Sequence, residues 1–475
     1  MSNADVREVA TMTRTIRHYA VMRTTPYLWD IYRKGDFSEV GRYMARQLAG
    51  WADKSTTFKV AALPSTGMAP FDADGKKRES ERPPSRLVVG LIMQDEDIAR
   101  QFENDVQRQA RDETEGVFVG SGADLPFSGA DHWCPSEASD PIFGDRARAE
   151  LLLRIPYIRD QKKLTGSGVN VVIVDQGLNA HALGNNYAGG WSVNNTILPG
   201  TATLDPTAPH RLHGMMIANN ILQVAPDARI FDLPMVPPRI TDVLDFFLHT
   251  ADAAYQAVTD SIDLYRLSGQ YTGPWILVNA WAIYDTKSEV PPGSYTNGPQ
   301  HAFNLEVVDA VNSEIDVVFC AGNCGQFCPD MRCGAADIGP GRSVLGANSL
   351  DAVLSVGAVR SDAKWLGYSS QGPGQPTLGT EKPDLCAASQ FGETNDAFTT
   401  NTGTSAACGL AAGVVAALRS NPNRDWGPNR VSLNDLKGIL NRTARKTDGP
   451  LWNRRTGNGI LDARAAFDEL EIAFP

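Results

Sequence analysis

The sequence predicts an α/β fold, in which a parallel sheet carries helices on both faces and follows a small α+β unit. Beyond residue 145, short strand-like runs alternate with helical stretches and are apolar on both sides, which is typical of parallel strands covered by helices. Before residue 120, amphipathic helical patterns accompany strand-like runs. A length of 475 residues allows two or three domains. We expect two, over residues 1–144 and 145–475.

Two helices are predicted in the N-terminal unit. Asp36 and Glu39 form the pattern of a capping box. After it, one helical face collects Val40, Tyr43, Met44, Leu48 and Trp51. A second helix is expected over 95–112, where acidic residues open the first turn and apolar residues recur every fourth position. It lies between strand-like runs at 87–93 and 116–120, so this unit contains a β-α-β segment.

A linker and a larger sheet are predicted after these elements. Residues 120–145 are rich in Gly, Ser, Pro, Asp and Ala with weak apolar periodicity, which favours a linker. The parallel strands are then expected at 169–174, 229–233, 275–278, 317–320 and 353–359.

Composition excludes several partners. The net charge is −11, from 44 basic and 55 acidic residues, so the field of the protein repels nucleic acid and anionic membrane surfaces. The longest apolar run, 406–418, is interrupted by Gly409 and Gly413 and is too short for a spanning helix. The N-terminal residues are polar and lack the pattern of a secretory signal. We therefore expect a cytoplasmic protein that binds neither nucleic acid nor membranes.

The seven cysteines do not form the paired framework of a small secreted protein. They are Cys134, Cys320, Cys324, Cys328, Cys333, Cys386 and Cys408. Cys324, Cys328 and Cys333 are close enough in sequence to bind zinc, but their spacing is not that of the usual CxxC pairs and no nearby His offers a fourth ligand. A disulfide within this loop, or packing of small side chains, is the favoured interpretation.

Three residues stand where a parallel sheet exposes side chains, at the carboxyl ends of strands. Asp175 ends a buried apolar run, His213 begins a helical stretch, and Ser405 opens a helix of small residues. Each has an ordinary alternative: a turn-forming Asp, a structural His, and a Ser that caps the helix. Together they supply the acid, base and nucleophile of a catalytic triad.

The chain order Asp, His, Ser resembles that of the subtilisin-like serine proteases, the subtilases. Further motifs of that family follow in the family's order from the neighbourhood of Asp145 to the C-terminus. They occupy residues 165–169, 225–228, 356–359, 368–373, 382–384, 403–407 and 457–463. The resemblance implies a subtilisin-like peptidase domain at 145–475 that acts on polypeptides.

The resemblance also implies a role for each residue. Ser405 would attack the peptide carbonyl, His213 would accept and return the proton, and Asp175 would orient the imidazole. Asn323, which follows Ala321 and Gly322, looks like the family's side-chain donor to the oxyanion, beside the backbone N–H of Ser405. No metal or organic cofactor is needed for this chemistry.

Several positions depart from the family pattern. Gln176 follows the Asp where Ser or Thr is usual, and Met215 replaces a Thr after the His. The segment Asn279, Ala280 and Trp281 corresponds to a substrate-binding strand that usually carries Ser and Gly, so Trp281 is expected to reshape the pocket and make the enzyme selective.

The N-terminal unit has two open roles. It resembles in outline the family's inhibitory prosegment, which is removed by self-cleavage, and it would equally suit a domain that recognises a partner. An α/β-hydrolase is excluded because no His follows Ser405. Two other functions stay open: a weakened subtilase fold that binds polypeptides, and a cysteine-based redox or metal module.

Overall fold

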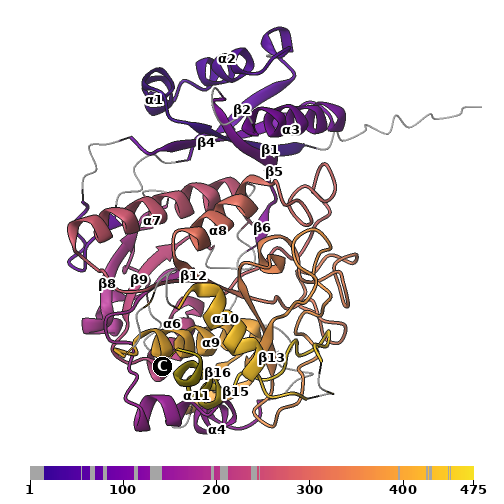
Figure 1. Cartoon of the computed structure of the whole chain (residues 1–475). Coiled ribbons are helices and arrows are strands. Elements are labelled where there is room, and N and C mark those ends of the chain that lie inside the picture. The colour runs from indigo at the N-terminus through magenta and orange to yellow at the C-terminus, as the bar shows by residue number, and fades with distance from the viewer. Residues whose placement is uncertain are drawn as a thin grey trace, which may run out of the picture.

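The computed structural model of the chain is shown in Figure 1. It describes residues 15–54, 56–64, 70–78, 83–111, 116–128, 142–193, 197–203, 212–236, 243–244, 246–393, 396–423, 426, 431–447, 449 and 451–474.

The N-terminal unit is an antiparallel sheet in the order β2-β4-β1-β5. Its strands are β1 (Ile16–Arg23), β2 (Phe58–Ala62), β4 (Arg86–Met93) and β5 (Phe118–Ala123). One face of the sheet packs on α1 (Pro26–Arg33), α2 (Phe37–Gln47) and α3 (Glu96–Ala110) around Trp51 and Phe102, and a 3-10 turn (Ala52–Lys54) follows α2. The predicted β-α-β segment is thus β4, α3 and β5.

The first part of the expected linker is ordered structure. β5 continues to Ala123, and a short strand β6 (Phe127–Ser128) follows and pairs antiparallel with β10 (Val243–Leu244). The prediction of a linker from residue 120 is wrong for these residues, because backbone pairing with a distant segment overrides their turn-rich composition. Residues 129–141 lie outside the described ones.

The main sheet has the order β14-β13-β12-β11-β7-β9-β8-β3 within the described residues. Its neighbours pair in parallel, except that β3 runs antiparallel to β8 at the edge. The strands are β3 (Pro70–Phe71), β7 (Asn170–Asp175), β8 (Tyr187–Trp191), β9 (Arg229–Pro234), β11 (Trp275–Asn279), β12 (Ile315–Cys320), β13 (Leu354–Val359) and β14 (Leu385–Ala388). The five predicted parallel strands are confirmed.

Helices cover both faces of the main sheet, as predicted. α6 (His213–Val224) and α9 (Gly403–Arg419) pack on one face, and α7 (Leu248–Ser268) and α8 (Ala302–Asn312) pack on the other. Figure 1 shows that α7 and α8 lie between the main sheet and the N-terminal sheet. The side chains of Tyr19 and Val21 on β1 therefore join the core of α7 and α8, while their neighbours face α1–α3.

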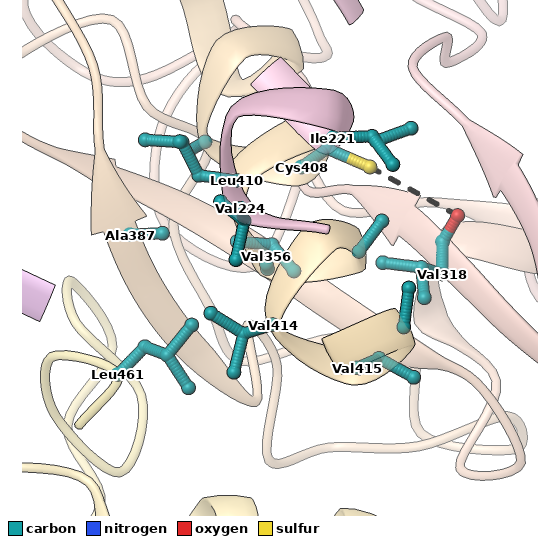
Figure 2. Packing of buried hydrophobic residues seen from close by; sticks show 14 of the residues in the cluster. Ile221, Val224, Val318, Val356, Ala387, Cys408, Leu410, Val414, Val415 and Leu461 are labelled. Atoms are coloured by element: carbon teal, nitrogen blue, oxygen red, sulfur yellow. Dashed lines mark hydrogen bonds between the residues drawn. The ribbon is translucent and has the colours of Figure 1, made fainter. Parts of the chain in front are cut away.

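The small residues of α9 allow it to lie in the centre of the core. All of its residues are buried, and Figure 2 shows its side chains packed against Ile221, Val224, Val318, Val356, Ala387 and Leu461 from other elements. A Cβ at Gly413 would lie 2.8 Å from the Cβ of Val224 on α6, which is closer than real carbon atoms approach. The contact fixes α6 against α9, and with them the first turns that hold His213 and Ser405.

The remaining described elements complete the second region. They are α4 (Arg146–Leu153), a π-helical turn (Tyr157–Gln161), α5 (Ala180–Leu183), 3-10 turns (Gly184–Asn186 and Gly346–Ser349), the hairpin β15 (Phe391–Glu393) and β16 (Asp396–Asn401), α10 (Leu433–Thr443) and α11 (Ala463–Ala473). Among the residues that the structure describes, no helix combines the length and the apolar character needed to cross a membrane.

Candidate active site

Asp175 and His213 meet at the carboxyl end of the main sheet. Asp175 is the last residue of β7, and each of its two carboxylate oxygens lies 2.8 Å from the Nδ1 atom of His213. The backbone N–H of Gln176 also donates to this carboxylate at 2.8 Å. A carboxylate in this position fixes the imidazole with its Nε2 atom directed away, ready to accept a proton.

Two residues that depart from the family pattern, Gln176 and Met215, both make hydrogen bonds near His213. His213 is the first residue of α6, and the preceding Leu212 offers no side-chain cap. The side-chain oxygen of Gln176 accepts from the backbone N–H of His213 at 3.3 Å and thus serves one of the unpaired donors of that helix end. The sulfur of Met215, two residues further along the helix, accepts from the backbone N–H of Asn179 at 3.4 Å.

Ser405 lies in the first turn of α9. Thr402 occupies the N-cap position of this helix, so the interpretation of Ser405 as a simple N-cap is wrong. Its Oγ atom donates to the backbone oxygen of Ala280 at 3.1 Å, and it shares a cavity with His213. In this structure the Ser405 hydroxyl is thus hydrogen-bonded to the backbone of Ala280.

Asn323 is held by the turn that carries Ser405. Its side-chain oxygen accepts from both the backbone N–H and the hydroxyl of Thr404, each at 2.9 Å. This pairing directs the amide Nδ2 atom away from α9, where it donates to the hydroxyl of Tyr284 at 3.0 Å. The preceding Gly322 has φ +97, a left-handed conformation that favours glycine.

The expected substrate-binding residues divide into two groups. Ala280 and Trp281 line the same cavity as Ser405. Asn279 lies behind it, where its side-chain oxygen accepts from the hydroxyl of Tyr255 at 2.6 Å and from the indole of Trp281 at 3.2 Å. Ala321 and Gly322 are backbone supports of Asn323: Ala321 N–H donates to Val356, and Gly322 N–H donates to Thr404.

The cavity that these residues share is small. It measures about 10 Å³, roughly the room for one water molecule. The exposed fractions of Asp175, His213, Asn323 and Ser405 are 1%, 2%, 1% and 2%. The cavity is completed by Phe127, Val236, Ala282, Tyr284 and Arg332.

None of these five lining residues was predicted as a site residue from the sequence. Phe127 lies in the segment interpreted as a linker, and its ring stacks on Phe247 and meets the edge of Trp281. Tyr284 and Arg332 come from two different loops, and the guanidinium of Arg332 lies 4.5 Å from the centre of the Tyr284 ring. No local pattern marks such contacts, because each joins residues that are distant in sequence.

The cysteine-rich loop after Asn323 contains a disulfide between Cys324 and Cys333. Sulfurs in a disulfide cannot serve as thiolate ligands, so the zinc interpretation of this loop is wrong. Within the described residues, no cluster of His, Cys, Asp or Glu is arranged to hold a metal ion.

Two free cysteines lie close to the site but are buried. Burial raises the pKa of Cys320 to about 12 and places that of Cys408 well above its ordinary value. Both thiols are therefore protonated at neutral pH, which disfavours the redox-module interpretation, because thiolates are the reactive form.

Comparisons with known proteins agree with the family resemblance. The model of the subtilase family, Peptidase S8, matches residues 166–459, a range that includes Asp175, His213, Asn323 and Ser405. A comparison with curated protein sequences finds no match.

The chain is also similar to solved structures of MycP1. One, from the ESX-1 type VII secretion system, is 18% identical with a TM-score of 0.47 over 72% of this chain and 91% of that one. Another, from Mycobacterium smegmatis, is 18% identical with a TM-score of 0.46 over 72% and 90%. A third, MycP1 with its N-terminal propeptide removed, is 18% identical with a TM-score of 0.41 over 67% and 96%.

Proposed function

Because this chain belongs to the subtilase family of serine peptidases, we propose that it is an endopeptidase with Ser405 as its nucleophile. The observation that carries the proposal is the contact of His213 Nδ1 with Asp175 at 2.8 Å, beside the cavity that Ser405 and Asn323 share. Acid, base, nucleophile and oxyanion donor are then held by β7, α6, α9 and the end of β12.

In the proposed reaction, the Oγ atom of Ser405 attacks the carbonyl carbon of the peptide while its proton passes to Nε2 of His213. Asp175 stabilises the imidazolium that forms. The negative charge on the former carbonyl oxygen is met by the Nδ2 group of Asn323 and the backbone N–H of Ser405. His213 returns its proton to the leaving amine, and water then releases the acyl group by the same steps in reverse.

We propose that the N-terminal unit, residues 1–144, holds the site closed and is removed by self-cleavage. In support, Ser128 and Phe127 of β6 pair with Val243 and Leu244 of β10, as an extended peptide would when it adds to a strand. Phe127 also lines the cavity of Ser405. The segment thus places the Phe127 side chain against the site.

The same contact suggests how the enzyme selects substrates. The Phe127 ring stacks on Phe247 with 4.2 Å between ring centres and lies edge-on to Trp281 at 6.1 Å. When the N-terminal segment leaves, it takes Phe127 with it. The rings of Phe247 and Trp281 would then form an aromatic recess beside β10. We propose that preferred substrates place an aromatic side chain there.

A weakened fold that binds polypeptides is the alternative function. The observation that favours it is the small cavity of about 10 Å³, in which the Nδ2 group of Asn323 is already bound to Tyr284. A site in this state retains polypeptide-binding surfaces without room for the reacting carbonyl.

One experiment separates the two functions. A proteome-derived peptide library is incubated with the wild type and with Ser405→Ala, and new termini are sequenced. A peptidase creates cuts in the wild type only, with aromatic residues enriched at one fixed position near the cut. No cuts beyond those of the variant would contradict peptidase activity, and an unenriched pattern would contradict the aromatic recess alone.

Self-cleavage is tested by intact mass. If the wild type is shortened during expression while Ser405→Ala stays full-length, the N-terminal unit is a prosegment. If both remain full-length under conditions in which the wild type cuts other polypeptides, self-processing is wrong.

A cytoplasmic location remains a proposal. The disulfide between Cys324 and Cys333 weighs against it, because disulfides persist mainly in oxidising compartments. Alkylation of thiols at the moment of cell lysis decides the matter. Alkylated Cys324 and Cys333 support the cytoplasm, and an intact disulfide contradicts it.

A further inference from the structure

The hydroxyl of Tyr284 accepts a hydrogen bond from the amide that the proposed reaction assigns to the oxyanion. An oxyanion donor must lie about 2.7–3.1 Å from the oxygen that it stabilises. The Nδ2 atom of Asn323 lies 3.0 Å from the Tyr284 hydroxyl. Its orientation is fixed by the two hydrogen bonds from Thr404, so the amide cannot turn to a second acceptor without losing both.

Tyr284 is held in this position from two sides. The guanidinium of Arg332 stacks on its ring, and Arg332 is in turn paired with Asp330 through two contacts of 2.8 Å. The backbone oxygen of Tyr284 accepts from Gly334 N–H at 2.8 Å. The exposed fraction of the whole residue is 9%.

The loop that carries these partners is tied to Asn323 itself. Cys324 directly follows Asn323, and its disulfide partner Cys333 directly follows Arg332. The backbone N–H of Asp330 donates to the backbone oxygen of Asn323 at 2.9 Å. Asn323 thus contacts Tyr284, Tyr284 contacts Arg332, and Arg332 lies in the loop that the disulfide joins to the residue after Asn323.

We propose that Tyr284 limits the reaction rate at the oxyanion site. Its hydroxyl competes with the substrate's carbonyl oxygen for the Asn323 amide. The inference rests on the proposed peptidase function. A peptide reacts only after the phenol has left Nδ2, and substrates that expel it from beneath Arg332 are selected over those that do not. Tyr284 acts through Asn323 and is a positioning residue.

Tyr284→Phe tests this inference with little structural change. The ring and its stacking with Arg332 remain, and only the competing oxygen is removed. A neutral hydrogen bond contributes little net stability, so the expected gain in reaction rate is about threefold to tenfold.

The measurement is the second-order rate constant for modification of Ser405 by one small fluorophosphonate, whose phosphonyl oxygen needs the same donor. The full-length chain is used, as wild type, Tyr284→Phe, Asn323→Ala and the double variant. Tyr295→Phe is the matched control, because that buried hydroxyl accepts from Ala347 N–H away from the cavity. Thermal unfolding of each variant checks that it is folded.

The expected result is a threefold to tenfold faster modification of Tyr284→Phe, no change in Tyr295→Phe, and less than a twofold effect of the substitution when Asn323 is already Ala. A slower or unchanged Tyr284→Phe overturns the inference, as does an equal gain without Asn323. If wild-type Ser405 is modified normally, such a failure leaves the peptidase function standing. If Ser405 is modified neither in these variants nor in Phe127→Ala, which removes the N-terminal ring from the cavity, the peptidase function itself fails.

Discussion

The ring of Phe127 stacks on the ring of Phe247, with 4.2 Å between their centres and 20° between their planes. Phe127 belongs to the strand that leaves the N-terminal unit, and Phe247 is the N-cap of α7. The contact thus joins the N-terminal chain to the main domain beside the cavity of Ser405. In the full-length chain, the N-terminal segment therefore contacts the site directly.

Removal of the Phe127 ring is predicted to open the site. Phe127→Ala loses a buried aromatic side chain, a change that costs about 3–5 kcal/mol in a well-packed core. The substitution weakens the packing of β6 against the cavity. We therefore expect the fluorophosphonate to modify Ser405 at least tenfold faster than in the wild type.

Phe467→Ala is the matched control for Phe127→Ala. Phe467 is a buried ring on α11, outside the cavity of Ser405. We expect its loss to lower stability without changing the modification rate. Equal rates for Phe127→Ala and the wild type would show that the segment does not restrict the site.

The Asp175 carboxylate is predicted to act through the imidazole. Asp175→Asn preserves size but favours the wrong tautomer of His213, a change that typically lowers kcat about 10⁴-fold. Peptide hydrolysis should fall by this factor with little change in KM or in thermal unfolding. The exposed Asp227→Asn is the control and should behave as the wild type. A loss of less than tenfold for Asp175→Asn would contradict the assigned role.

The Cys324–Cys333 disulfide is predicted to stabilise the loop that orients Asn323. It closes a loop with a sequence separation of 9, for which chain entropy gives about 3 kcal/mol. Replacement of both by Ser should lower the free energy of unfolding by about this amount and also lower kcat. Cys328→Ser, a free thiol in the same loop, should change neither quantity. An unchanged kcat in the double variant would show that Asn323 does not depend on the disulfide.

Glu103 makes the stability of the closed form depend on pH. It lies on α3 and accepts from the hydroxyl of Ser294 at 3.1 and 3.0 Å, across the contact between the two units. Burial raises the pKa of Glu103 from 4.5 to about 7, although the Ser294 hydrogen bond opposes this. Between these values the folded chain keeps a proton that the unfolded chain has lost. The contribution of Glu103 to the free energy of unfolding is therefore fully present below pH 4.5 and is lost as the pH rises to about 7.

Urea unfolding at pH 4.5, 5.5 and 7 checks this prediction. The free energy of unfolding of the wild type, relative to Glu103→Gln, should fall over this range by an amount on the order of 3 kcal/mol. A constant difference between the wild type and Glu103→Gln over this range would refute the assigned titration.

The sequence predicted the main sheet because its strands are apolar on both faces, as at Asn170–Asp175. It did not predict β1, where Arg17 and His18 interrupt the apolar pattern. His18 is nevertheless fully buried, and that burial lowers its pKa to about 3. The predicted helical face that ends with Trp51 also extends too far, because α2 ends at Gln47. Trp51 lies in the following turn, where its indole N–H donates a hydrogen bond to Asp105.

At the site, the sequence predicted the residues whose positions follow strand and helix ends. Asp175, His213, Asn323 and Ser405 converge because the carboxyl ends of parallel strands share one edge. Tyr284 and Phe127 were not predicted, because their contacts depend on loops that come together only in the folded chain. The small size of the cavity is likewise a property of tertiary packing and has no local signal.

Modification of Ser405 by a fluorophosphonate, located by peptide mass spectrometry, tests the central claim most directly. We predict one phosphonylated residue, Ser405, in the folded wild type, strongly reduced modification in His213→Ala, and none after heat unfolding. Failure to modify Ser405 in folded Phe127→Ala, in which the site is open, would contradict the account of this chain as an active serine peptidase.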